Sequence, residues 1–419
     1  MLIRGGRVVD PSGPLDALRD VRIDHGVIVE IGSDLAAREG EETIDATGAI
    51  VAPGFIDMHV HLREPGFPEK ETIATGTLAA ARGGFSAVAC MPNTNPALDE
   101  PATLADLEQR IAREGVVRVY PIAAITRGRK GETHVDFAAL ARAGAVGFSD
   151  DGNTVMNARV LRDAALDALE IPGVFISHAE DEHLKGNAVM NEGAVSRALG
   201  VAGSPAVAED IIVARDLMIG AETGKAWHIA HLSTRGALES LLHARAHGGR
   251  ATAEVTPHHL LLTDETVREL GGEGKVNPPL RTQDDARVLR DAVREGSIDV
   301  FATDHAPHTA AEKSSDLQHA AVGFTGLEIA VGAYARAVPD LSMLRFVELL
   351  STNPARILGV PGGSLAPGSP ADITIFADRP WLVDPSQFAS KGKATPFAGW
   401  ELPRQAIATI VGGRLVFQR

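Results

Sequence analysis

Through the middle of the chain, short apolar runs alternate with alanine-rich segments of helical periodicity, a pattern that few folds accommodate. Such alternation is typical of repeated βα units that build a parallel sheet. About eight units can be drawn, with helices near 71–82, 155–168, 206–219 and 235–246 and strands ending near His59, Met91, Ile125, Ser149, His178, His231, Glu254 and Thr303. Eight units predict an α/β fold with a (β/α)8 TIM-type barrel over residues 52–360, whose active site lies at the carboxyl ends of its strands.

The two ends of the sequence have a different pattern, with short strands and turns in place of alternating strands and helices. Short strand patterns separated by glycine turns occur near residues 20–31, and residues 371–376 and 406–411 repeat them. We therefore predict one small composite β-sandwich domain that combines residues 1–51 with residues 361–419. In the sequence, the barrel would lie between these two segments.

Composition limits the partners and the kinds of metal site. Cys90 is the single cysteine among 419 residues, so no intrachain disulfide can form and any metal must be held by nitrogen and oxygen ligands. The formal net charge of −15 argues against nucleic acid and anionic membranes as partners. No apolar run has the length of a membrane span, and basic residues interrupt the first segment, unlike a secretory signal. We expect a cytoplasmic protein in which Cys90 is a buried structural thiol.

Histidines and aspartates gather at the expected strand ends. His59 and His61 are two residues apart in a strand, so their imidazoles point to the same side, which suits a metal. The other interpretation is a pair of histidines that pack in the core. Further candidate ligands would converge on the same rim, namely Asp150 or Asp151, His178, His231 and Asp304. Four imidazoles and two carboxylates suffice for two divalent ions if one carboxylate bridges; zinc suits them best, with manganese, cobalt and iron as alternatives.

Four motifs connect the chain to a known family. They are His59-Val60-His61-Leu62-Arg63-Glu64-Pro65-Gly66, Met91-Pro92-Asn93-Thr94, Asp150-Asp151-Gly152 and Asp304-His305-Ala306-Pro307-His308. Through them the chain resembles the amidohydrolase superfamily and, within it, the dihydroorotase family in its longer bacterial form. The resemblance extends essentially from end to end. It also implies the composite β domain described above.

The resemblance implies a role for each matching residue. His59, His61 and Asp304 would hold a first metal ion, and His178 and His231 a second, with Asp151 bridging the two. One or two zinc ions per subunit are therefore expected. Asp304 would also be the catalytic general acid and base. The substrate-binding set implied by the resemblance is His61, Arg63, Asn93, Asn277, His308, Val322 and Gly323.

The implied activity is a metal-dependent cyclic amide hydrolase that interconverts dihydroorotate and N-carbamoyl-L-aspartate in de novo pyrimidine biosynthesis. One alternative is a non-catalytic homologue that scaffolds aspartate carbamoyltransferase, although none of the expected histidines is missing. Another is a hydrolase resembling hydantoinases or allantoinases. Those relatives bridge their metals with a carboxylated lysine on the fourth strand, and residues 144–152 contain no lysine. A homodimer is the expectation for the family.

Residues 309–322 follow His308 directly and contain a polar stretch that includes Ser315. Long loops over the mouth of a barrel are often functional, so we predict a mobile lid here. The alternative interpretation is an ordinary polar surface loop.

Overall fold

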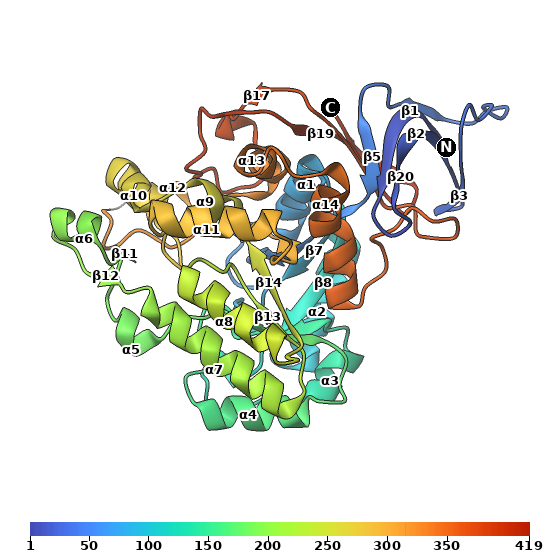
Figure 1. The fold of residues 1–419 in the computed structure, drawn as a ribbon. Coiled ribbons are helices and arrows are strands. Elements are labelled where there is room, and N and C mark those ends of the chain that lie inside the picture. The colour runs from blue at the N-terminus through green and yellow to red at the C-terminus, as the bar shows by residue number, and fades with distance from the viewer. Residues whose placement is uncertain (315) are drawn as a thin grey trace.

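The structure is a computed structural model that describes every residue except 315, and its centre is a barrel of eight parallel strands (Figure 1). A bridge between Val60 and His305 brings the first strand beside the chain that follows the last, so the barrel is nearly closed. The hydrogen-bonded neighbours follow chain order: β6 (Phe55–Val60), β7 (Phe85–Cys90), β8 (Arg118–Ala123), β9 (Gly147–Phe148), β10 (Val174–Ser177), β13 (Trp227–Ile229), β14 (Ala251–Val255) and β15 (Val300–Phe301). The predicted barrel is confirmed.

Helices surround this barrel (Figure 1). Every residue of β6, β7 and β10 is buried, as expected for parallel strands covered on both faces. The longer helices are α1 (Ile73–Gly83), α2 (Pro101–Glu114), α4 (Ala158–Asp167), α7 (Val207–Thr223), α8 (Arg235–Ala246), α11 (Gln283–Arg294) and α13 (Ala330–Ala337). Among the described residues, no helix combines the length and the apolar character needed to cross a bilayer.

Short elements fill the connections. Two pairs of two-residue strands lie outside the barrel, β11 (Met190–Asn191) with β12 (Gly203–Ser204) and β17 (Trp381–Leu382) with β18 (Glu401–Leu402). The shorter helices are α3 (Phe137–Arg142), α5 (Glu182–Lys185), α6 (Ala194–Leu199), α9 (Pro257–Leu261), α10 (Asp264–Leu270), α12 (Ala310–Lys313), α14 (Met343–Val347) and α15 (Asn353–Leu358).

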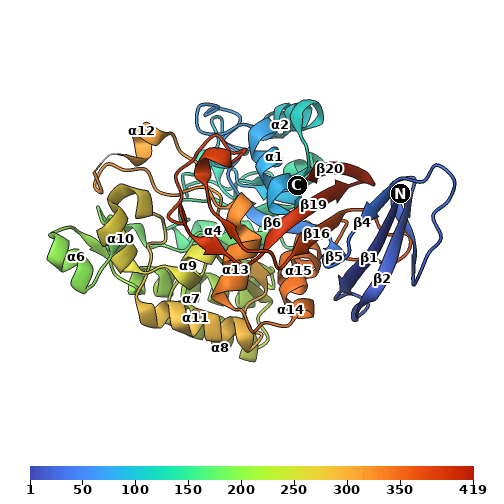
Figure 2. The same ribbon diagram turned by 90° about the horizontal axis from the view of Figure 1, so that it is seen from above.

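A second sheet combines strands from both ends of the chain and lies to one side of the barrel (Figure 2). Its hydrophobic core takes side chains from both segments, such as Val8 and Ile23 from the first and Ile373 and Ile410 from the second. Its strands are β1 (Leu2–Asp10), β2 (Leu15–Asp24), β3 (Val27–Gly32), β4 (Thr43–Asp45), β5 (Ile50–Pro53), β16 (Ile373–Ala377), β19 (Gln405–Val411) and β20 (Arg414–Gln418).

Several predicted boundaries shift for local reasons. Helix α4 begins at Ala158 rather than near residue 155, because the Asn157 side chain caps it by accepting from two backbone N–H groups. Helix α7 continues past the predicted end at residue 219 to Thr223, and the ring of Trp227 packs closely against it at Gly220. Helix α8 has the predicted bounds.

Residues 309–322 are not a featureless loop. Thr309 caps the short helix α12, and Lys313 at its end is buried, with Nζ donating to the carbonyls of Lys275 and Ala321 at 3.1 and 2.9 Å. Ser315, which belongs to the predicted lid, lies outside the described residues. The mobility of this segment stays a prediction.

Candidate active site

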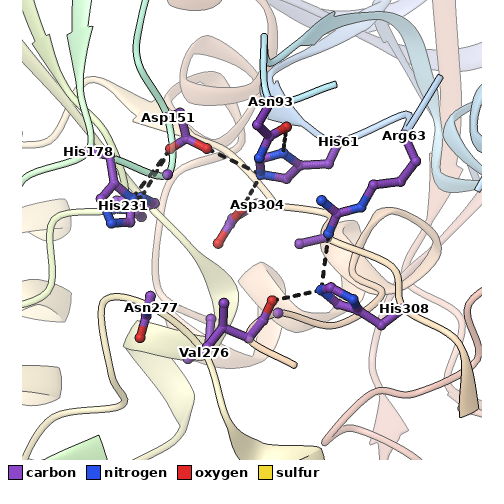
Figure 3. Close-up of a pocket in the computed structure, with 14 residues that line it drawn as sticks. His61, Arg63, Asn93, Asp151, His178, His231, Val276, Asn277, Asp304 and His308 are labelled. Carbon is purple, nitrogen blue, oxygen red and sulfur yellow. Dashed lines mark hydrogen bonds and ion pairs between the residues drawn. The ribbon is translucent and has the colours of Figure 1, made fainter. Parts of the chain in front are cut away.

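A pocket of about 130 Å³ opens where the carboxyl ends of the barrel strands meet, and its size suits a small molecule (Figure 3). Most of the residues that line it have polar or charged side chains. The lining residues are His61, Arg63, Asn93, Asp151, Gly152, His178, His231, Val276, Asn277, Asp304, Ala306, His308, Val322 and Gly323. All the substrate-binding residues expected from the sequence therefore line one pocket.

Four of the expected metal ligands form one compact group. Nε2 of His59 lies 3.4 Å from Asp151 Oδ1 and 3.5 Å from Asp304 Oδ1. Nε2 of His61 lies 3.1 Å from Asp304 Oδ1 and 3.6 Å from Asp151 Oδ2. All four side chains are buried, and His61, Asp151 and Asp304 also line the pocket.

Asp151 is shared with a second group. Its Oδ1 lies 3.4 Å from His178 Nδ1 and 3.8 Å from His231 Nε2, and these two nitrogens are 2.9 Å apart. Two sets of three ligand atoms each lie within 4.8 Å of one another, one from His59, His61 and Asp151 and the other from Asp151, His178 and His231. In addition, His59 Nε2 and Asp151 Oδ1 are buried without a hydrogen bond. Imidazole and carboxylate atoms left in this state fit divalent cations such as zinc.

The charges of the two groups are mutually dependent. Burial alone would lower the pKa of His59, but the carboxylates of Asp151 and Glu254 raise that pKa well above its usual range. Burial would raise the pKa of Asp151, yet the charge of His59 and the nearby imidazoles of His178 and His231 hold this pKa well below its usual value. The pKa of Asp304 is likewise lowered, against the effect of burial, by His59 and His61. Both aspartates are thus kept as carboxylates able to bind cations.

Glu254, at the end of β14, supports this arrangement and was assigned no role in the sequence analysis. Its Oε1 lies 2.6 Å from His59 Nδ1 and accepts from the backbone N–H of His231 at 3.1 Å, while Oε2 lies 3.1 Å from His228 Nε2. A carboxylate behind an imidazole fixes its tautomer and ring orientation. In the sequence, the feature that could have pointed to Glu254 is its position as an acidic residue at the end of a buried strand.

The neighbouring aspartates Asp150 and Asp151 face different surroundings. Asp150 accepts hydrogen bonds from the backbone N–H groups of Ile125 and Thr126 at 2.8 and 2.9 Å, which ties the end of β8 to the end of β9. Arg129 donates to the backbone carbonyl of Asp151 at 2.8 Å. Asp150 and Arg129 therefore hold the turn that directs the Asp151 carboxylate into the pocket.

Arg63 and His308 lie on the opposite side of the pocket from His178 and His231 (Figure 3). A guanidinium nitrogen of Arg63 lies 3.1 Å from His308 Nε2, which is also 2.8 Å from the Val322 carbonyl oxygen. Burial and the charge of Arg63 lower the pKa of His308 to about 3, so this imidazole is neutral. Arg63 remains the positive charge of this side and can pair with a substrate anion.

The remaining expected residues are placed by the loops. Asn93 Oδ1 lies 2.9 Å from His61 Nδ1. Gly323 has a φ of +110°, its N–H donates to the Lys275 carbonyl at 3.0 Å, and a Cβ at this position would lie 2.6 Å from Ala306 Cβ. Only glycine fits here.

Three non-glycine residues that line the pocket have left-handed backbone conformations. The φ angles of Arg63, His231 and Asp304 are +63°, +31° and +47°. Such conformations cost on the order of 1–3 kcal/mol each and persist where the surrounding structure enforces them. Backbone strain thus coincides with the residues expected to bind metal and substrate.

Comparison with known proteins places this site in context. Residues 48–237 match the family described as Dihydro-orotase-like, and residues 234–417 match the Amidohydrolase family. A dihydroorotase from Pelotomaculum thermopropionicum is 50% identical and covers 100% of this chain and 98% of that protein. A dihydroorotase from Geobacter metallireducens is 46% identical, with 100% of both chains covered.

Solved structures share the fold. An L-hydantoinase (dihydropyrimidinase) from Arthrobacter aurescens superimposes with a TM-score of 0.89 at 24% identity, covering 100% of this chain and 96% of that chain. A D-hydantoinase (dihydropyrimidinase) from Thermus sp. gives a TM-score of 0.84 at 24% identity, covering 99% and 94%. At these identities the similarity concerns architecture alone.

Proposed function

The chain belongs to the dihydroorotase family of amidohydrolases, and we propose on this basis that it reversibly hydrolyses dihydroorotate to N-carbamoyl-L-aspartate in pyrimidine synthesis. The observation that carries the proposal is the pairing within one pocket of the His and Asp groups with the anion-binding side at Arg63. Hydrolysis of a cyclic amide needs the His and Asp groups, and recognition of the substrate carboxylate needs Arg63.

The proposed metal ligands are the six residues expected from the sequence, with zinc as the proposed ion. Their donor chemistry and the orphaned atoms of His59 and Asp151 support this assignment. Bound divalent ions would polarise the ring carbonyl and activate a water molecule. Two ions per subunit, with Asp151 bridging, are the proposed full occupancy.

The protein side chains would perform the remaining tasks. The Asp304 carboxylate can take a proton from the attacking water and deliver it to the ring nitrogen as the C–N bond breaks. Arg63, Asn93 and His308 would hold the substrate carboxylate, with His61 beside it. Asn277 and the backbone at Val322 and Gly323 would contact the ring.

The alternative functions are less well supported. The hydantoinase-like neighbours share the fold only, and the stretch 144–152 carries Asp151 and no lysine. A purely scaffolding homologue has no need of a complete ligand set, and all six residues are present. A homodimer, association with aspartate carbamoyltransferase and a cytoplasmic location remain proposals.

The test combines metal content and dihydroorotate turnover on the same purified sample. We expect a chelator to remove activity and zinc to restore it. Asp304→Asn should lower kcat at least about 100-fold, the usual contribution of a general acid and base. Asp340→Asn, at an exposed aspartate, is the matched control and should retain activity. Zinc-loaded wild type that turns over hydantoin but not dihydroorotate would refute the proposal.

A further inference from the structure

Lys185, the last residue of α5, contacts a pocket residue that the metal groups do not include. When the Asn277 amide is oriented so that its hydrogen bonds are satisfied, its oxygen lies 2.6 Å from Lys185 Nζ and its nitrogen donates to the Val276 carbonyl at 3.1 Å. The reverse orientation of the amide would set its NH₂ against the ammonium group, which has only donors. Lys185 therefore allows one orientation of this amide.

Lys185 is itself held in place by a buried carboxylate. Its Nζ donates to Glu180 Oε2 at 2.5 Å, and the same oxygen lies 3.3 Å from His178 Nε2. The Glu180 side chain is only 2% exposed, whereas that of Lys185 is 20% exposed. A charge-assisted bond of this kind restricts the ammonium group to one position.

Two further lysines near this part of the pocket, Lys275 and Lys313, are committed elsewhere, and Lys313 donates to the carbonyls of Lys275 and Ala321. Lys275 Nζ donates to the carbonyls of Leu317 and Gln318 at 2.9 and 3.0 Å. Its ammonium group is therefore directed at the segment after α12. Lys185 is the cation that acts on Asn277.

We propose that Lys185 is a positioning residue for substrate recognition: it fixes the Asn277 amide with its oxygen turned away and its nitrogen available to the substrate. The amide nitrogen has two N–H groups, and Val276 accepts only one of them. The second can donate to a ring carbonyl oxygen of dihydroorotate. The pocket thus selects an acceptor atom at this position. This inference rests on the proposed function, because it needs that ring beside Asn277.

A double-mutant cycle tests the coupling. Lys185→Met keeps the length of the side chain and removes its donors, so we expect KM for dihydroorotate to rise about tenfold with kcat changed less than about threefold. In an Asn277→Ala background the same substitution should change KM by less than about twofold, because its target is gone. Lys185→Arg, which retains donors and charge, should restore part of the loss. Glu182→Gln, an exposed change on the same helix, is the matched control.

Two further readouts separate the possible failures. Metal content and the chelator-competition affinity for zinc should be equal in wild type and Lys185→Met, which excludes loss of the metal as the cause. If the wild type is active and the double variant raises KM by the product of the two single effects, the two residues act independently and the proposal is overturned. If the wild type shows no turnover, the proposed function fails. In that case, calorimetric dissociation constants for dihydroorotate are compared among the wild type, Lys185→Met, Asn277→Ala and the double variant. If dihydroorotate does not bind, or if the two substitutions are not coupled, the proposed role of Lys185 is overturned.

Discussion

Glu254→Gln should weaken zinc binding without replacing any proposed ligand. The carboxylate contacts two imidazoles and one backbone N–H group, and its shortest contact, 2.6 Å, is with Nδ1 of His59. Glutamine has the same shape but carries no charge and keeps only one accepting oxygen, so His59 loses its charged acceptor whichever way the amide is oriented. The imidazole of His59 is then no longer fixed in the tautomer that directs Nε2 toward Asp151.

The magnitude follows from the bond that is lost. A hydrogen bond to a charged group contributes about 2 kcal/mol, which corresponds to roughly a 30-fold change in an equilibrium constant. Loss of a carboxylate partner behind a metal-binding imidazole typically costs about 10- to 100-fold in metal affinity. We therefore expect the zinc dissociation constant of Glu254→Gln to rise within this range.

Competition between apoprotein and a chromophoric chelator of known zinc affinity measures the change. Asp216→Asn is the matched control, because it also removes a buried carboxylate, one whose partners are Ser177 and Arg215. Its zinc affinity should equal that of the wild type. The reasoning is refuted if Glu254→Gln binds zinc within about twofold of the wild type, or if the control loses as much.

Three further outcomes are expected. Arg63→Lys should raise KM for dihydroorotate about 10- to 100-fold in steady-state kinetics, because lysine lacks the paired donors that fit a carboxylate; an unchanged KM would contradict the assigned role. Burial raises the pKa of Glu328 to about 7, above its unfolded value, so the wild type binds a proton on folding and its free energy of unfolding falls by about 1 kcal/mol per unit between pH 5 and 7. Urea titrations of Glu328→Gln should lack this fall, and parallel pH profiles would count against it. Tyr334→Phe removes a hydroxyl that donates to the carbonyls of Val255 and Ala302 at 2.7 and 2.6 Å; it should lower the free energy of unfolding in a denaturation experiment by about 1–3 kcal/mol with kcat unchanged.

The fold and the membership of the pocket could be predicted because both depend on short-range patterns. Alternation of strand and helix patterns determines a barrel, and a barrel gathers the ends of its strands at one rim. His59 and His61 needed only the two-residue repeat of a strand to be placed together. His178 and His231 needed only the positions of two strand ends. The structure brings these four side chains to one rim.

Details that depend on the backbone leaving a strand could not be predicted. Sequence spacing does not distinguish Asp150 from Asp151, because the turn after β9 decides which carboxylate enters the pocket. Strand β8 ends at Ala123, two residues before the predicted position near Ile125, for a related reason. The chain stays extended there, but the N–H groups of Ile125 and Thr126 bond to the Asp150 side chain and not to a neighbouring strand. The contact between Lys185 at the end of α5 and Asn277 joins segments that are far apart in the sequence, so no local pattern predicts it.

Because the second sheet combines both ends of the chain, it cannot be completed until translation is nearly finished. Strand β5 pairs with β16, and the backbone N–H of Phe55 bonds to Thr374 across 319 residues of sequence. At roughly 5–20 residues per second, a ribosome needs on the order of 15 to 65 s to make the intervening chain. During this interval β5 presents an unpaired edge that could join other chains. Pairing with β16 covers this edge once the C-terminal segment has been made.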